Sequence, residues 1–223
     1  MSTSPTPKSV KGYKGWGMEG AVARWYARNT ANQDRQKAAA QGVASQVFPG
    51  SSVLEVAPGP GYLAIELAKL GAYHVVGLDI SHTFVEIATA NAKAAGVPVD
   101  FRHGNAAHMP FPADSFDFIV CQAAFKNFSE PVLALREMHR VLKPNGKALI
   151  LDLRRDASRE AIKAEVKNMA LDWVNALMTT LALSWLRKRA YTQEQFRQMV
   201  SQTPFKTCEM QEVPIGLAVS LRK

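Results

Sequence analysis

Residues Val53 to Lys69 spell VLEVAPGPGYLAIELAK, and this stretch predicts the fold better than any other. An apolar run with one acid is interrupted by Ala57-Pro58-Gly59-Pro60-Gly61, after which apolar residues return at helical spacing. This order is typical of a buried strand, a tight turn and a helix. Glycines let the backbone come close to a ligand, while the following helix points free amide N–H groups at the same place. The turn is therefore a candidate cradle for a ligand with a negative end.

A second apolar run, from Tyr73 to Ser81, carries Asp79 about twenty residues beyond the glycines. In a strand–helix–strand unit, an acid at this spacing lies beside the first turn and can accept hydrogen bonds from both hydroxyls of a ribose. We predict this role for Asp79. Because the segment Gly59 to Ala64 also fits the G-x-G-x-x-G/A dinucleotide pattern, a nicotinamide cofactor and another adenosine cofactor both remain open.

Three further features separate these two readings. Glu55 precedes the glycines, Asn105-Ala106 follows a third apolar run, and Arg140 to Lys147 (RVLKPNGK) leads into a fifth. This series resembles the class I S-adenosylmethionine-dependent methyltransferases, especially the small single-domain group with an RVLKPGG-type ending, over roughly residues 50 to 155. The resemblance implies an α/β fold: a doubly wound, seven-stranded, mostly parallel sheet with an antiparallel last strand, helices on both faces and a helical lid insertion.

The resemblance also implies S-adenosylmethionine as cofactor and S-adenosylhomocysteine as product. The cofactor carboxylate is then expected against the glycine turn, and the ribose on Asp79. The adenine is expected between Ile80 and the Asn105-Ala106 segment. Further contacts with the cofactor are expected from a first-strand acid, from the end of the fourth strand and from the N-terminal helices: Glu55, Gln122 and Tyr26.

The methyl acceptor is less well predicted. Many relatives carry paired histidines where this chain has Lys126-Asn127, so their mechanism cannot be carried over. Lys126 and His108 are the candidate catalytic groups, for binding the acceptor or handling a proton. Arg154 and Tyr191 are further candidates near the methyl group, and such cations would suit an anionic acceptor. No acid cluster resembles a metal site.

Four functions therefore stay open. The first is a methyltransferase that acts on a small molecule by in-line displacement. The formal charge of +8 keeps an RNA or protein methyltransferase as an alternative, although nucleic acid is not the preferred partner. A nicotinamide-dependent oxidoreductase and a cofactor-binding module without turnover complete the set. Oligomeric state is not predicted.

Composition is that of an ordinary globular protein. The 223 residues are 47% hydrophobic and 21% charged, which fits one domain with small additions. The cysteines, Cys121 and Cys208, form no disulfide or metal pattern and suggest a reducing compartment. The polar N-terminus does not resemble a signal sequence, so we expect a cytoplasmic protein without a transmembrane segment.

Four regions are expected along the chain. They are a flexible N-terminal segment with cap helices (1–48), a cofactor-binding core (49–155), a helical insertion (156–190) and a C-terminal helix with an antiparallel strand pair (191–223). The apolar positions of the insertion suit a long helix or a helix pair, as a lid, a membrane-surface element or a dimer interface. Within the first region, Met18 to Arg28 is a predicted helix whose Trp25 is expected to pack on the core. Ser129 is a predicted cap for the helix that follows it.

Overall fold

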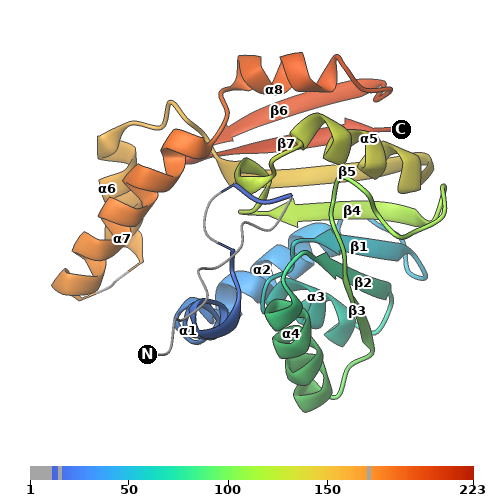
Figure 1. Cartoon of the computed structure of the whole chain (residues 1–223), viewed down its shortest axis with the longest axis horizontal. Coiled ribbons are helices and arrows are strands. Elements are labelled where there is room, and N and C mark those ends of the chain that lie inside the picture. The colour runs from blue at the N-terminus through green and yellow to red at the C-terminus, as the bar shows by residue number, and fades with distance from the viewer. Residues whose placement is uncertain (1–11, 15–16, 170–171) are drawn as a thin grey trace, which may run out of the picture.

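A computed structural model describes residues 12–14, 17–169 and 172–223. Its centre is a seven-stranded sheet in the order β3-β2-β1-β4-β5-β7-β6 (Figure 1). The strands are β1 (Ser52–Val56), β2 (His74–Asp79), β3 (Val99–His103), β4 (Phe116–Gln122), β5 (Leu142–Leu153), β6 (Thr207–Val213) and β7 (Gly216–Arg222). Neighbours from β3 to β5 pair in parallel, whereas β7 runs antiparallel to both β5 and β6. The predicted sheet is confirmed.

Helices cover both faces of this sheet (Figure 1). The helices of the described residues are α1 (Gly20–Thr30), α2 (Gln33–Ala44), α3 (Tyr62–Lys69), α4 (His82–Ala95), α5 (Pro131–Val141), α6 (Arg159–Asn168), α7 (Trp173–Leu186) and α8 (Gln193–Val200), with short 3-10 turns at Phe125–Asn127 and Arg187–Arg189. Side chains alternate along a strand. Val53 of β1 accordingly packs with α2 and α3, while its neighbour Leu54 packs with α5 and α8.

The carboxyl ends of the central strands meet at one edge of the sheet. β1 is flanked by β2 on one side and β4 on the other, so the strand order reverses there. Such a reversal leaves a crevice beyond the strand ends, which is where open α/β sheets bind ligands. The α6–α7 pair follows β5 and projects beyond this edge, away from the helices that cover the sheet (Figure 1).

Two local predictions were wrong. Trp25 is 60% exposed, because α1 begins at Gly20 and packs through its small residues Ala23 and Ala27, which permit a close approach to α4. Ser129 does not cap α5, which starts with Pro131 at its first turn and has no side-chain cap. The backbone N–H of Ser129 instead donates to the carbonyl of Gly12.

The expectations for the fifth strand and for the insertion agree more closely with the structure. The fifth apolar run is a strand, as expected, but β5 begins earlier and includes Pro144-Asn145-Gly146, at a register shift against β4 where Asn145 has φ +65°. The insertion is a helix pair, as anticipated, apart from residues 170–171, which lie outside the described part of the chain. Residues 1–11 of the expected N-terminal segment also lie outside the described part of the chain. Of the helices described, none is long and apolar enough to cross a membrane.

Candidate functional site

The glycine turn after β1 combines one packed glycine with one open glycine. Gly61 caps α3 with φ +79°, and a Cβ there would lie 2.6 Å from the Phe101 ring. Gly59 has φ +56°, but an added Cβ would meet no atom within 4 Å. Only glycine adopts both conformations readily. The turn is thus fixed underneath by Phe101 and open above Gly59, where a ligand can reach its backbone.

Asp79 holds this turn from the end of β2. Its Oδ2 accepts a hydrogen bond from the Gly59 N–H at 2.9 Å, and its Oδ1 accepts one from the Ser81 N–H at 2.9 Å. The side chain is buried, and this burial raises its pKa to about 6 despite the two amide donors. Each carboxylate oxygen has a second lone pair, so Asp79 can still accept hydrogen bonds from a ligand.

Glu55 is the second buried acid beneath the turn. Its Oε2 accepts a hydrogen bond from the Ala64 N–H at 2.9 Å, in the first turn of α3. Burial raises its pKa to about 8, and the charge of Asp79 adds to this rise. Within the described residues, no Lys, Arg or His nitrogen lies within ion-pair distance of Glu55 or Asp79. The described residues thus provide no cationic side chain that would favour the ionised form of these two acids.

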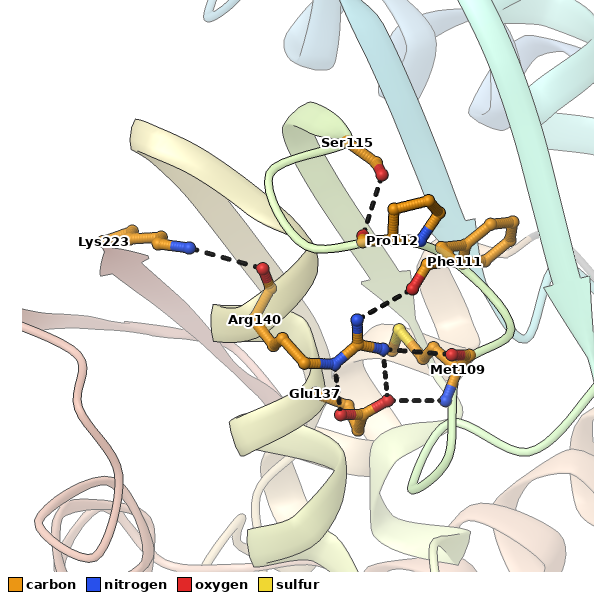
Figure 2. Close-up of polar contacts among 7 residues, drawn as sticks. All are labelled: Met109, Phe111, Pro112, Ser115, Glu137, Arg140 and Lys223. Carbon is orange, nitrogen blue, oxygen red and sulfur yellow. Dashed lines mark hydrogen bonds and ion pairs between the residues drawn. The ribbon is translucent and has the colours of Figure 1, made fainter.

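The segment after β3 is held in place from α5 (Figure 2). The Arg140 guanidinium donates to the carbonyls of Phe111 and Met109 at 2.7 and 3.0 Å, and pairs with Glu137. Glu137 in turn accepts the Met109 N–H at 2.7 Å. The RVLKPNGK motif thereby fixes the loop that carries Asn105 and Ala106, because its arginine bonds the backbone just downstream.

Asn105 itself is partly used within this loop. Its Oδ1 accepts the Ala107 N–H at 2.9 Å, leaving one lone pair for an adenine amine. Ile80 lies across from it, since a Cβ on Gly12 would touch both side chains, at 2.6 Å from Ile80 and 2.8 Å from Asn105. Ile80 and Asn105 thus both lie close to Gly12.

Gly12, Tyr13 and Lys14 form a strap over this edge that the sequence did not predict. Tyr13 forms an antiparallel bridge with Phe128, and the Lys14 N–H donates to the Asn127 carbonyl at 2.6 Å. Desolvation raises the pKa of the Tyr13 phenol, with Asp79 and Tyr26 among the charges that act on it. These bonds hold the strap against the segment that follows β4.

Glu19 ties the N-terminal helix to the same place. Its carboxylate accepts the backbone N–H groups of His82 and Thr83, at 2.9 and 3.1 Å, and the Thr83 hydroxyl at 2.6 Å. These donors lie at the start of α4, directly after the turn that contains Asp79. Sequence reasoning missed Glu19, because its partners are more than sixty positions away and no local pattern joins them.

Lys126 and Asp152 form a buried ion pair at the other end of the crevice. Lys126 Nζ lies 2.8 Å from Asp152 Oδ1 and also donates to the Ala123 carbonyl, while the Lys126 N–H donates to Asp152 Oδ2 at 2.7 Å. Both side chains are only 4% exposed. The ammonium therefore fixes the turn after β4, where Ala123 has φ +58°.

Comparison with known proteins gives the family of this core. A family model described as "Methyltransferase domain" matches residues 54–150. These residues form a class I methyltransferase domain. The chain is 39% identical to the uncharacterized methyltransferase YcgJ of Bacillus subtilis, over 45% of this chain and 40% of that protein. It is 36% identical to the demethylmenaquinone methyltransferase of Deinococcus radiodurans, over 48% of this chain and 44% of that protein.

The fold agrees over a longer span than the sequence does. A SAM-dependent methyltransferase from Aquifex aeolicus superposes with a TM-score of 0.69 and 18% identity, covering 89% of this chain and 97% of the other. The chain spans less than half of the length of the two curated relatives above. The methyltransferase domain is therefore assigned by sequence, whereas the elements outside residues 54–150 share only the fold.

The other predicted site residues are dispersed around the methyltransferase domain. His108 is exposed, and its charge acts on Glu137 rather than on the Lys126 pair. Tyr26 stacks edge-on against Phe84 at 5.8 Å, and Gln122 is half-buried at the end of β4. Tyr191 accepts a hydrogen bond from Lys14 Nζ at 2.7 Å. No contact among the described residues joins His108 to Lys126.

Two buried polar atoms near the Lys126 pair have no hydrogen-bond partner within the described residues: Asn127 Oδ1 and Arg154 Nε. Arg154 otherwise pairs with Asp156 and Glu212, at 3.3 and 3.1 Å. Native proteins leave few such atoms unpaired. The Asn127 oxygen can therefore accept a hydrogen bond from a ligand or from water, and the Arg154 Nε–H can donate one. A separate hollow of about 270 Å³ is lined by residues of α1 and by Tyr62 and Asn91, and neither Glu55 nor Asp79 lines it.

Proposed function

We propose that the chain binds S-adenosylmethionine and transfers its methyl group to a small-molecule acceptor. The observation that carries this proposal is the pair of buried acids, Glu55 and Asp79, which lack a cationic partner beside the open turn at Gly59. S-adenosylmethionine carries an ammonium and a sulfonium, and this positive charge would favour the ionised form of both acids. The homologous relatives named as demethylmenaquinone methyltransferases support a small-molecule acceptor of the quinone type.

We assign each part of the cofactor to a set of residues. Backbone groups of Ala57, Pro58, Gly59 and Gly61 face the amino-acid end, and Glu55 binds or orients its ammonium. Asp79 accepts the ribose hydroxyls. Ile80 and the Asn105-Ala106 segment enclose the adenine, while Gln122 and Tyr26 border the same space. When bound, the cofactor supplies an electrophilic methyl group, and these residues fix its direction toward the acceptor.

A nicotinamide dinucleotide is the runner-up ligand, and Glu55 argues against it. In a dinucleotide site the pyrophosphate lies on the amide groups at the helix N-terminus after the glycines. Here the carboxylate of Glu55 already accepts the Ala64 N–H of that helix. A pyrophosphate would lie next to this acid and Asp79, and its negative charge would oppose the ionisation of both.

For the acceptor end, we propose that Lys126 orders the turn after β4 and that substrate contacts come from Asn127 and Arg154. The Arg154 Nε, unpaired among the described residues, supports an acceptor with a hydrogen-bond-accepting or anionic group. His108 is retained as a second candidate for proton handling. The free thiols of Cys121 and Cys208 support a cytoplasmic location, since reduced cysteines are typical there.

The decisive test is calorimetric titration of cofactor-stripped protein with S-adenosylmethionine, S-adenosylhomocysteine and NADH. We expect binding of the first two and none of NADH. Asp79→Ala should weaken S-adenosylmethionine binding at least 100-fold, because the variant loses both the ribose acceptor and the bond to Gly59. Asp100→Ala is the matched control, since Asp100 is an exposed acid on the neighbouring strand β3 and should bind normally.

Tight binding of NADH, or equal affinity in wild type and Asp79→Ala, would contradict the proposed function. If the cofactor binds as expected, quinone and other small acceptors are screened by release of homocysteine from the product. An RNA methyltransferase would instead show RNA affinity that falls steeply with salt.

A further inference from the structure

The outer face of α7 is an exposed apolar surface. Six large apolar side chains of this helix are between 45% and 79% exposed: Trp173, Val174, Leu177, Met178, Leu181 and Trp185. At about 100° per residue these six fall within an arc of about 140°. None of the residues of α7 is buried. Monomeric proteins rarely leave such a continuous apolar patch in water without a partner.

The opposite side of α7 packs on α6, which carries a row of cations. Ile162 and Val166 are the buried residues of α6, and α6 contacts α7 along its length. Arg159, Lys163 and Lys167 are four residues apart, so they lie on one side of α6, and all three are exposed. Within the described residues none of these three forms an ion pair.

The far end of α7 carries further positive charge. Arg187, Lys188 and Arg189 follow directly, and the Arg189 guanidinium lies 4.1 Å from the centre of the Trp185 ring. Lys188 is exposed. An apolar helix face with tryptophans near both ends and cations beside it is the pattern of a helix that lies in a membrane interface. With 14 residues, α7 is shorter than the roughly 20 that a spanning helix needs.

We propose that the α6–α7 pair docks on an anionic lipid surface, with α7 parallel to the membrane. Trp173, Leu177 and Leu181 would enter the headgroup boundary, while Lys163 and Lys167 attract acidic lipids. A second copy of the chain fits less well, because a symmetric contact through α7 would bring the cationic rows of two α6 helices together.

Docking would also place the acceptor side of the domain on the membrane. α6 follows β5, whose end carries Asp152 and Arg154 beside the turn held by Lys126. Resting on the proposed methyl transfer, this arrangement favours an acceptor that is dissolved in the bilayer. Membrane docking itself does not depend on that function and is tested separately.

The test is co-sedimentation of the full chain with vesicles of phosphatidylcholine, with and without phosphatidylglycerol. We expect wild type to pellet with the mixed vesicles and much less with phosphatidylcholine alone. Trp173→Glu/Leu177→Glu and Lys163→Glu/Lys167→Glu should each reduce binding at least tenfold. Phe48→Glu is the matched control, because Phe48 is 84% exposed but distant in sequence from both helices, and this variant should bind as wild type.

Equal sedimentation of wild type and the α7 double variant would overturn the proposal. The proposal would also be overturned if wild type does not bind vesicles but forms a dimer, and if Trp173→Glu/Leu177→Glu dissociates that dimer in light scattering. All variants are also titrated with S-adenosylmethionine. Loss of vesicle binding with unchanged cofactor affinity supports docking, while failure of wild type to bind the cofactor would contradict only the methyltransferase function.

Discussion

Asp79 and Asp152 are both buried acids near carboxyl ends of strands in one sheet, yet their surroundings differ. Asp79 accepts hydrogen bonds from two backbone amides, and in the described part of the chain neither it nor the acid Glu55 forms an ion pair. Asp152 is neutralised by Lys126 within the protein. A buried charge must be compensated by a partner of opposite charge. The two acids differ in where that partner can come from. Lys126 compensates Asp152 within the protein, whereas we propose that a cationic ligand compensates Asp79 and Glu55.

The largest effect is expected from removing one member of the Lys126–Asp152 ion pair. Lys126→Met should destabilise the fold by about 3–5 kcal/mol, because it leaves Asp152 buried without its partner. Lys126→Met/Asp152→Asn should recover most of this loss, as both charges are then gone. Urea unfolding of the three proteins measures the difference.

The same double variant tests the catalytic hypothesis for Lys126. If Lys126 only orders the turn, the double variant keeps methyl transfer with an unchanged pH profile. A stable double variant that binds the cofactor but has no turnover would instead support the sequence-based prediction of proton handling.

The next-largest effect is a pH dependence of stability that comes from Glu55. The folded-state pKa of Glu55 is raised to about 8, so between about pH 5 and 8 the folded chain holds a proton that the unfolded chain has lost. Stability should therefore fall as pH rises through this window, by roughly 3 kcal/mol. Glu55→Gln keeps an acceptor for the Ala64 N–H and should be much less pH-dependent. Thermal unfolding at pH 5 and pH 8.5 compares the two.

Ligand binding sharpens this prediction. If the cofactor ammonium meets Glu55, binding at pH 7 should release a proton from wild type and none from Glu55→Gln. Calorimetry in buffers of different ionisation enthalpy measures the proton count. Equal counts in both proteins would contradict the assignment of Glu55 to the ammonium.

A smaller effect separates two glycines of one turn. Gly61→Ala should cost about 2 kcal/mol or more, from the left-handed conformation and from the clash with Phe101. Gly59→Ala should cost only about 1 kcal/mol, since its Cβ enters open space, but should weaken S-adenosylmethionine binding about tenfold. Similar stability losses and similar affinities in both variants would show that Gly59 does not face the ligand.

The smallest effect is expected at the support behind the adenine loop. Arg140→Ala should cost about 1 kcal/mol and weaken cofactor binding several-fold, because it frees the loop at Met109 and Phe111 (Figure 2). Arg136→Ala is the control on the same helix, since Arg136 bonds the Gln202 carbonyl instead. Unaltered affinity in Arg140→Ala would limit Arg140 to a structural role.

The sequence predicted best where function and local backbone geometry coincide. The glycine turn and the placement of Asp79 follow from spacing, because short strand–helix–strand units have few ways to fold. The seven-stranded sheet was implied by the resemblance to methyltransferases. Predictions failed where a partner comes from far along the chain. Trp25 was expected in the core, but Ala23 and Ala27 pack there instead, since α1 is positioned by the bonds of Glu19 to α4.

The sequence by itself predicted the methyltransferase core and the position of the glycine turn and Asp79 at one edge of the sheet, because these positions are fixed by local turns and by alternation along strands. Only the tertiary structure decided the state of each charge. It paired Lys126 with Asp152, left Glu55 and Asp79 without a cation and exposed one face of α7. The physical reason is that burial and ion pairing depend on neighbours that come together only when the whole chain folds.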